Sequence, residues 1–216
     1  MPASLSFMEA TLRDRLAGTL PGAEAQQRFA PKPIVKGWRP GQAGENTRIA
    51  AALLLLYPLG PGVGIALTVR AEGLRRHAGQ ISLPGGVVDQ GETLVEAALR
   101  EAAEEIGVDR AGVRVLGELT PVHVIVSGFT LHPIVGVSDA RPAFVAAPGE
   151  VAEVLEASLD DLRDASRIRH GTRIREGVAI EYPYFDLHGH QVWGATAMVL
   201  GELIALLEQE QLPWGH

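Results

Sequence analysis

The sequence predicts an α/β fold in which a mixed β-sheet lies between layers of helices. Strand-like segments recur from residue 48 onward, and only a few helical segments, one of them strongly amphipathic, separate them. No internal repeat or low-complexity block is visible along the 216 residues. The length fits one domain, so we expect residues 1–37 to form an N-terminal helix and arm and residues 38–216 to form the main domain.

The N-terminal helix is expected because apolar residues recur at helical spacing until a proline and a glycine end the pattern. A polar stretch with several prolines and glycines then continues to about Asn46 and is expected to be an arm or cover. The residues of the helical pattern are Met8, Leu12, Leu16 and Leu20, followed by Pro21 and Gly22.

Most of the remaining elements are expected to be strands. The two most apolar ones are joined by a turn with the sequence Leu-Gly-Pro-Gly, and a loop with small elements follows them. The expected strands are 48–57, 63–70, 113–120, 122–126 and 130–137, with further strand signals near 179–193. The expected loops are 71–92 and the segment that ends at Gly149, and a final helix is expected from about 195 to 209.

Residues 93–106 give the clearest helix signal in the chain. Thr93 and Glu96 have the spacing of a capping box, and Gly107 supplies the stop. One face of this helix is an apolar stripe made of Val95, Ala98, Leu99, Ala102 and Ile106.

Charge and composition exclude several functional classes. The net charge is −7, with only two lysines, so we expect no nucleic-acid partner and no membrane partner. There are no cysteines, which excludes thiolate metal sites and cysteine nucleophiles. The N-terminus lacks the layout of a signal peptide, and the apolar run from Ile49 to Tyr57 is too short to span a membrane. A cytoplasmic protein is therefore expected.

The polar face of helix 93–106 concentrates acidic residues. Glu101, Glu104 and Glu105 have the spacing i, i+3, i+4, which brings three carboxylates together on one helix face. Like charges at this spacing repel one another and destabilise a helix. When a cation is bound between them, the same charges become stabilising. Hard oxygen ligands favour Mg²⁺ or Mn²⁺ over zinc. The tight loop before the helix, Leu83-Pro84-Gly85-Gly86, could offer a backbone carbonyl to the same cation.

The segment GVVDQGETLVEAALREAAEEIGV, residues 86–108, resembles the Nudix box at every polar and glycine position of that motif. Ala102 stands where the family usually has a larger aliphatic residue. The resemblance implies a Nudix α/β/α sandwich whose cation is held by Glu101 and Glu105, with Glu104 assisting. In that family the backbone carbonyl at the position of Gly85 often binds the cation as well. Catalysis would further depend on Glu92 and Arg100, which would orient the ligands.

The preceding segment LTVRAEGLRRHAGQISLPGG, residues 67–86, resembles the signature of coenzyme A pyrophosphatase-like Nudix proteins. Ala66 and Leu83 depart from it by apolar exchanges, and the resemblance extends over about residues 38–210. It implies hydrolysis of coenzyme A or its derivatives to 3′,5′-ADP and 4′-phosphopantetheine. The guanidinium groups of the arginines in this segment suit phosphate recognition. The substrate-binding residues it implies are Arg70, Arg75, Arg76, His77 and Gly86.

Several alternatives stay open at this point. One is a Nudix hydrolase of ADP-ribose, NADH or another nucleoside diphosphate derivative, and another is a catalytically silent Nudix-fold binding module. Either Glu150 or Glu153 could supply a further carboxylate to the site. The oligomeric state is also open, with a homodimer as one option. His188 and His190 are interpreted as residues of a hairpin turn rather than as a metal pair.

Overall fold

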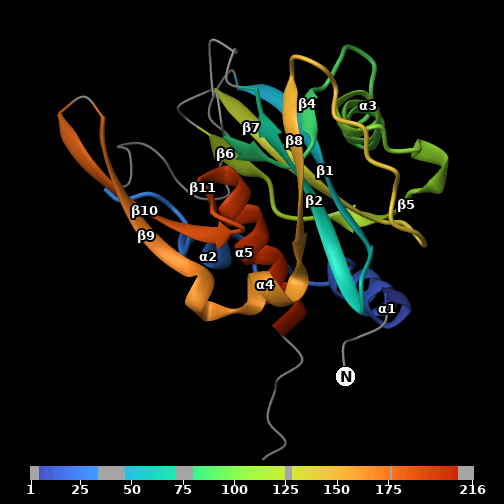
Figure 1. The fold of residues 1–216 in the computed structure, drawn as a ribbon, viewed down its shortest axis with the longest axis horizontal. Coiled ribbons are helices and arrows are strands. Elements are labelled where there is room, and N and C mark those ends of the chain that lie inside the picture. The colour runs from blue at the N-terminus through green and yellow to red at the C-terminus, as the bar shows by residue number, and fades with distance from the viewer. Residues whose placement is uncertain (1–4, 34–46, 72–79, 125–127, 176, 209–216) are drawn as a thin grey trace, which may run out of the picture.

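A computed structural model of the chain describes residues 5–33, 47–71, 80–124, 128–175 and 177–208. Figure 1 shows a central twisted sheet with helices on both sides. The helices are α1 (Leu5–Leu16), α2 (Gly22–Gln27), α3 (Leu94–Ile106), α4 (Leu159–Arg163) and α5 (Ala195–Glu208). The predicted mixed sheet between helical layers is thereby confirmed.

The main sheet has eight strands, and five of them follow the order β3-β2-β1-β7-β5. Strand β4 pairs with β1, β6 pairs with β7, and β8 pairs with β2. The pair β1–β7 is parallel and the other pairs are antiparallel. The strands of this sheet are β1 (Arg48–Leu59), β2 (Gly62–Arg70), β3 (Ile81–Ser82), β4 (Gly85–Val87), β5 (Arg114–Glu118), β6 (Val122–Val124), β7 (Phe129–Val137) and β8 (Val151–Ser158).

A second sheet of three strands has the order β11-β10-β9. Its strands are β9 (Ile168–Arg175), β10 (Val178–Leu187) and β11 (His190–Trp193). The turn between β10 and β11 has positive φ at His188 (53°) and Gly189 (86°), as a two-residue hairpin turn requires. His188 lies in the hairpin turn, as predicted, whereas His190 is the first residue of β11.

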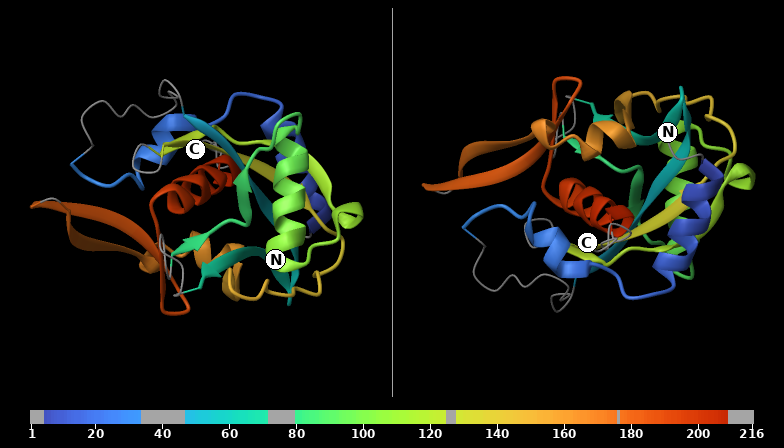
Figure 2. Two further views of the ribbon diagram at one scale, coloured as in Figure 1. Left: turned by 90° about the horizontal axis from the view of Figure 1, so that it is seen from above. Right: turned by 90° about the horizontal axis from the view of Figure 1, so that it is seen from below.

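Strand β1 is buried on both faces, which explains its continuous apolar sequence. Leu54 and Leu56 belong to the core beneath α5, whereas Leu53 and Leu55 belong to the core beneath α3. All four side chains are fully buried. The sheet therefore separates two hydrophobic cores, and Figure 2 shows α3 and α5 on its opposite sides.

The N-terminal segment packs on the same body as the rest of the chain. Met8 and Leu12 of α1 lie in the core beneath α5. The fully buried carboxylate of Glu202 on α5 accepts hydrogen bonds from Gly22 N (3.1 Å) and Gln26 Nε2 (2.8 Å) at α2. It also accepts one from Thr120 N (3.3 Å), so this one carboxylate joins α2, α5 and the loop between β5 and β6.

Three elements differ from the prediction. Helix α2 lies in the stretch that was expected to be an arm, and β8 and β9 lie in stretches without a predicted strand. Strand β8 contains alanine and glutamate, which favour helices, and β9 is rich in arginine and lies at a sheet edge. No helix of the described chain combines the length and the apolar character needed to cross a membrane.

Candidate metal centre

Helix α3 begins and ends where its sequence predicts. Thr93 caps it, because its hydroxyl accepts from Glu96 N (3.2 Å) while the Glu96 carboxylate accepts from Thr93 N (2.8 Å). Gly107 ends the helix in the left-handed conformation, with φ of 71°. Ala98, Ala102 and other small residues are fully buried against the sheet. The small residue at position 102 thus lets α3 lie close to the strands.

Two glycines of β4 make this close packing possible. A Cβ atom on Gly85 would lie 2.5 Å from the backbone oxygen of Ala51, and a Cβ atom on Gly86 would lie 2.3 Å from Glu101 Oε1. The backbone of β4 therefore touches β1 on one side and the carboxylate of Glu101 on the other. The sequence motif requires glycine at both positions for steric reasons.

Substituting these two glycines is expected to have different consequences. Gly85→Ala should destabilise the fold by about 1–3 kcal/mol, because the new methyl group meets rigid backbone. Gly86→Ala should cost less stability but lower activity, because its methyl group meets the flexible end of Glu101 and displaces it. Thermal denaturation and initial rates of both variants test this. Equal losses of stability in the two variants would contradict it.

Glu105 is a buried carboxylate with a single hydrogen bond from the neighbouring loop. Its side chain is 6 % exposed and accepts from Gly85 N at 3.0 Å. Burial raises the pKa of Glu105 to about 7, and the charges of Glu101 and Glu150 act in the same direction. The Gly85 hydrogen bond and the positive charge of Arg70 lower the pKa of Glu105 and offset part of this shift.

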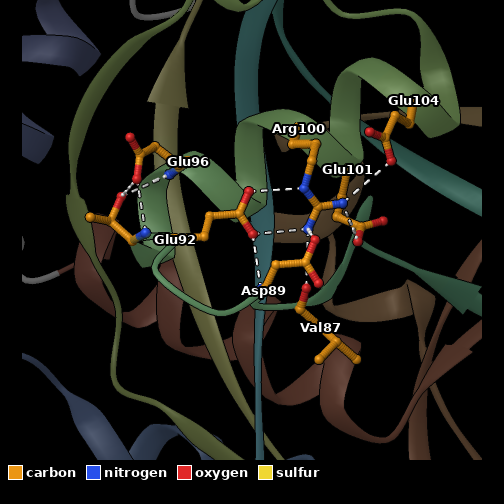
Figure 3. Close-up of polar contacts among 8 residues, drawn as sticks. Val87, Asp89, Glu92, Glu96, Arg100, Glu101 and Glu104 are labelled. Atoms are coloured by element: carbon orange, nitrogen blue, oxygen red, sulfur yellow. Dashed lines mark hydrogen bonds and ion pairs between the residues drawn. The ribbon is translucent and has the colours of Figure 1, made fainter.

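Arg100 holds the acidic residues on the outer side of α3 (Figure 3). Its guanidinium donates to both carboxylate oxygens of Glu92, from Nε at 2.8 Å and from Nη2 at 3.0 Å. Its Nη1 donates to Glu101 Oε1 at 2.8 Å and to Glu104 Oε2 at 3.3 Å. Its Nη2 also donates to the Val87 carbonyl at 3.1 Å, which joins α3 to β4. The hydrogen bonds from Arg100 are the main cause that lowers the pKa of Glu92.

The structure brings most of the predicted site residues together around α3 and β4. Glu104 is the most exposed of the three helix carboxylates, with 57 % of its side chain accessible. Within the described ranges, no three acidic or histidine side chains already stand in the geometry of a bound metal ion, and Glu101 and Glu104 both contact Arg100. The residues brought together are Gly85, Gly86, Glu92, Arg100, Glu101, Glu104 and Glu105.

Arg70 lies at the end of β2 on the α3 side of the sheet. Its Nε is buried and has no hydrogen-bond partner among the described residues, and its charge acts on Glu105. A register shift between Val69 and Arg70 pairs Arg70 with Val151, a residue of the core beneath α3. The predicted substrate-binding residues Arg75, Arg76 and His77 lie outside the described residues.

Glu153 faces away from this site. In the sheet it pairs with Val69, whose side chain belongs to the core beneath α5, and it lies 3.7 Å from His190 Nε2. Alternation along β8 therefore directs Glu153 to the face opposite α3.

Glu150, in contrast, lies beside the site. Its carbonyl accepts from Ala71 N at 3.0 Å, next to Arg70, and its charge raises the pKa of Glu105. Of the two carboxylates left open by the sequence, Glu150 is the one whose charge acts on Glu105.

Comparison with known proteins shows the family to which the chain belongs. Residues 47–176 match the NUDIX domain family model. The chain is 33 % identical over 165 residues to an uncharacterised Nudix hydrolase, NudL, of Photorhabdus laumondii, covering 76 % of this chain and 87 % of the relative. NudL of Cronobacter sakazakii is 38 % identical over 160 residues, covering 71 % of this chain and 80 % of the relative.

The fold resembles that of a Nudix hydrolase from M. smegmatis, RenU, in its crystal structure. The TM-score is 0.55 at 20 % identity, and the match covers 79 % of this chain and 90 % of that one. At this identity the likeness concerns the fold alone.

Proposed function

The chain belongs to the Nudix hydrolase family, and from that premise we propose that it hydrolyses the diphosphate bond of coenzyme A or its derivatives, giving 3′,5′-ADP and 4′-phosphopantetheine. One observation carries the proposal. The segment 67–86, which resembles the coenzyme A pyrophosphatase signature, leads directly into the loop that contacts Glu101 and Glu105. Arg70 of this segment is partly exposed, its charge acts on Glu105, and its guanidinium can donate to a phosphate.

A divalent cation, Mg²⁺ or Mn²⁺, fits the residues of this site. The available donors are oxygens, and burial raises the pKa of Glu105, a cost that a bound cation would offset. Glu101 and Glu105 would be the main ligands, with Glu104 and the Gly85 carbonyl assisting. When bound, such a cation polarises a diphosphate and lowers the pKa of a water molecule.

The other residues position these ligands and the substrate. Arg100 receives a fixed orientation from both oxygens of Glu92, and in turn it holds Glu101 and Glu104. Arg70 would bind the diphosphate as a planar donor. Gly86 leaves room for the Glu101 carboxylate and would present its backbone to the substrate. Arg75, Arg76 and His77 complete the proposed substrate contacts on the basis of the sequence signature.

A substrate panel tests this proposal. The protein is incubated with Mg²⁺ or Mn²⁺ and with coenzyme A, dephospho-coenzyme A, ADP-ribose or NADH, and the products are identified by mass spectrometry. We expect the highest kcat/KM for coenzyme A, with 3′,5′-ADP as a product. A higher kcat/KM for ADP-ribose or NADH would overturn the substrate assignment. Absence of turnover of all four would favour a silent binding module.

A further inference from the structure

The three-stranded sheet exposes an aromatic surface on the side that faces away from the core. The hairpin of β9 and β10 extends from the body in Figure 1 and in both views of Figure 2. Phe185, Leu187 and Val192 are fully buried on the inner face of this sheet. By the strand register, the opposite face carries three partly exposed aromatic residues and two exposed arginines. One of these arginines, Arg169, lies opposite Tyr184 and is paired with Asp186. We call the other four residues the aromatic face: Arg173, Tyr182, Tyr184 and Trp193.

The rings of the aromatic face contact one another around Tyr182. The ring of Tyr182 lies 4.9 Å from that of Trp193 and 6.1 Å from that of Tyr184, measured between centroids. A Cβ atom on Gly171 would lie 2.6 Å from the Tyr182 ring, so this ring lies directly over the glycine backbone. The Tyr182 hydroxyl donates to Gln191 Oε1 at 3.3 Å. The rings are thus held in a fixed arrangement that leaves them partly accessible.

Positive charge accumulates on the strand next to these rings. Segment 163–175 contains five arginines and one aspartate in a chain of net charge −7. Arg169 is neutralised by Asp186 at 3.2 Å, and Arg167 by Asp161 at 2.7 Å. Arg173 has no acidic partner among the described residues, and its guanidinium lies 4.9 Å from the centroid of the Trp193 ring. Its charge is therefore available to an anion.

Sheet stability explains only part of this arrangement. An aromatic ring over a cross-strand glycine stabilises an edge strand, which accounts for the pair Tyr182 and Gly171. An exposed arginine on an edge strand also discourages pairing with another chain. Neither reason accounts for the position of the Arg173 guanidinium over the Trp193 ring or for a third ring, Tyr184. Aromatic rings beside an uncompensated arginine are the combination that binds nucleobases by stacking and phosphates by charge.

The sheet that carries the aromatic face packs on the α5 side of the main sheet, next to β3. Strand β11 packs beside β3, and Thr196 Oγ1 donates to the Ile81 carbonyl at 3.0 Å. His190 lies 3.7 Å from Glu153 of β8. Strand β3 leads through Leu83 and Pro84 into the glycine loop beneath Glu101, so a short segment of chain connects the two regions across the main sheet.

We propose that the aromatic face binds a purine nucleotide, with the base stacked on Tyr182 and Trp193 and a phosphate paired with Arg173. The assignment of this nucleotide to the adenine end of the substrate rests on the proposed function. Binding of the nucleotide itself does not, because it requires no hydrolysis.

A binding experiment with 5′-AMP tests this inference. The chain has three tryptophans, so a Trp38→Phe, Trp214→Phe background leaves Trp193 as the only one. We expect 5′-AMP to quench its fluorescence saturably, and ribose 5-phosphate to bind about 5- to 100-fold more weakly because it has no base to stack. No saturable quenching, or equal affinity for both probes, would overturn the inference. Binding of an RNA oligonucleotide in clear preference to 5′-AMP would overturn the choice of a free nucleotide.

Two variants locate the binding site. In the same background, Arg173→Gln should weaken 5′-AMP binding by about 3- to 10-fold. Arg169→Gln, on the same face but already paired with Asp186, should weaken it less than Arg173→Gln does. The two variants lose the same charge from the same strand, but only Arg169 is neutralised by an aspartate. Equal effects of the two variants, measured with circular dichroism unchanged, would contradict the assignment to the aromatic face.

The two proposals fail in different ways. If 5′-AMP binds but no nucleoside diphosphate derivative is hydrolysed, the aromatic face stands and the proposed function is wrong. If coenzyme A is hydrolysed with the same KM in wild type and Arg173→Gln, and 5′-AMP does not bind, the proposed function stands and this inference is wrong.

Discussion

Replacing Glu101 or Glu105 by glutamine is expected to reduce kcat/KM by more than about 100-fold, beyond the loss typical of a residue that only orients a ligand. Each substitution removes one negative charge without changing the volume of the side chain. The two carboxylates lie on either side of the glycine loop, Glu101 against Gly86 and Glu105 at the Gly85 amide. A cation bound between helix and loop would lose a main ligand in either variant.

Initial rates over a range of Mg²⁺ concentrations measure this effect. Glu104→Gln is the matched control, because it removes one charge from the same helix at a carboxylate that is 57 % exposed, and we expect a smaller loss. Glu92→Gln should cost about 10- to 100-fold through the orientation of Arg100. Near-normal rates and Mg²⁺ dependence in Glu101→Gln and Glu105→Gln would show that the metal is bound elsewhere.

The second prediction is that Glu105→Gln stabilises the metal-free protein while it removes activity. The pKa of Glu105 is raised from 4.5 to about 7 in the folded protein. A raised pKa means that the folded state binds this proton more tightly than the unfolded state does. The resulting stability is fully present below pH 4.5 and is lost as the pH rises through 7. At pH 8 the ionised carboxylate therefore lowers the free energy of unfolding by about 3 kcal/mol relative to a protonated one.

Thermal unfolding in EDTA at pH 5 and pH 8 tests this prediction. At pH 8 the glutamine variant should unfold about 6–10 °C above wild type, and the difference should shrink toward pH 5. Glu104→Gln should show no comparable gain, because Glu104 lies on the exposed side of the helix. Mg²⁺ should stabilise wild type at pH 8 and leave Glu105→Gln nearly unchanged. A glutamine variant that is less stable than wild type at pH 8 without metal would contradict the account.

Local sequence signals were sufficient for some elements and not for others. Helix α3 was predictable within one residue, because Thr93, Glu96 and Gly107 specify its ends without help from the rest of the chain. Strand β8 was not, because its glutamates and alanines favour a helix locally and only pairing with β2 makes the segment extended. Strand β9 forms through pairing with β10, although its arginines show no apolar alternation.

The same distinction applies to the site. The spacing of Glu101, Glu104 and Glu105 on one helix placed three carboxylates together, since a helix fixes such neighbours by itself. The orientation of Glu153 away from the site depends on the register of β8 against β2, which no local pattern encodes. The burial of Glu105, which raises its pKa, likewise depends on β4, which packs against the helix.

Direct titration with Mn²⁺ tests the central claim that the carboxylates of α3 hold the catalytic cation. Free Mn²⁺ is measured by electron paramagnetic resonance at pH 6 and pH 8 for wild type and Glu105→Gln. Because protons and metal compete for a carboxylate with a pKa of about 7, wild-type affinity should rise by about tenfold between these pH values. Affinity in Glu105→Gln should be lower and should change little with pH. Wild-type affinity that stays constant with pH, or equals that of the variant, would show that Glu105 does not hold the metal.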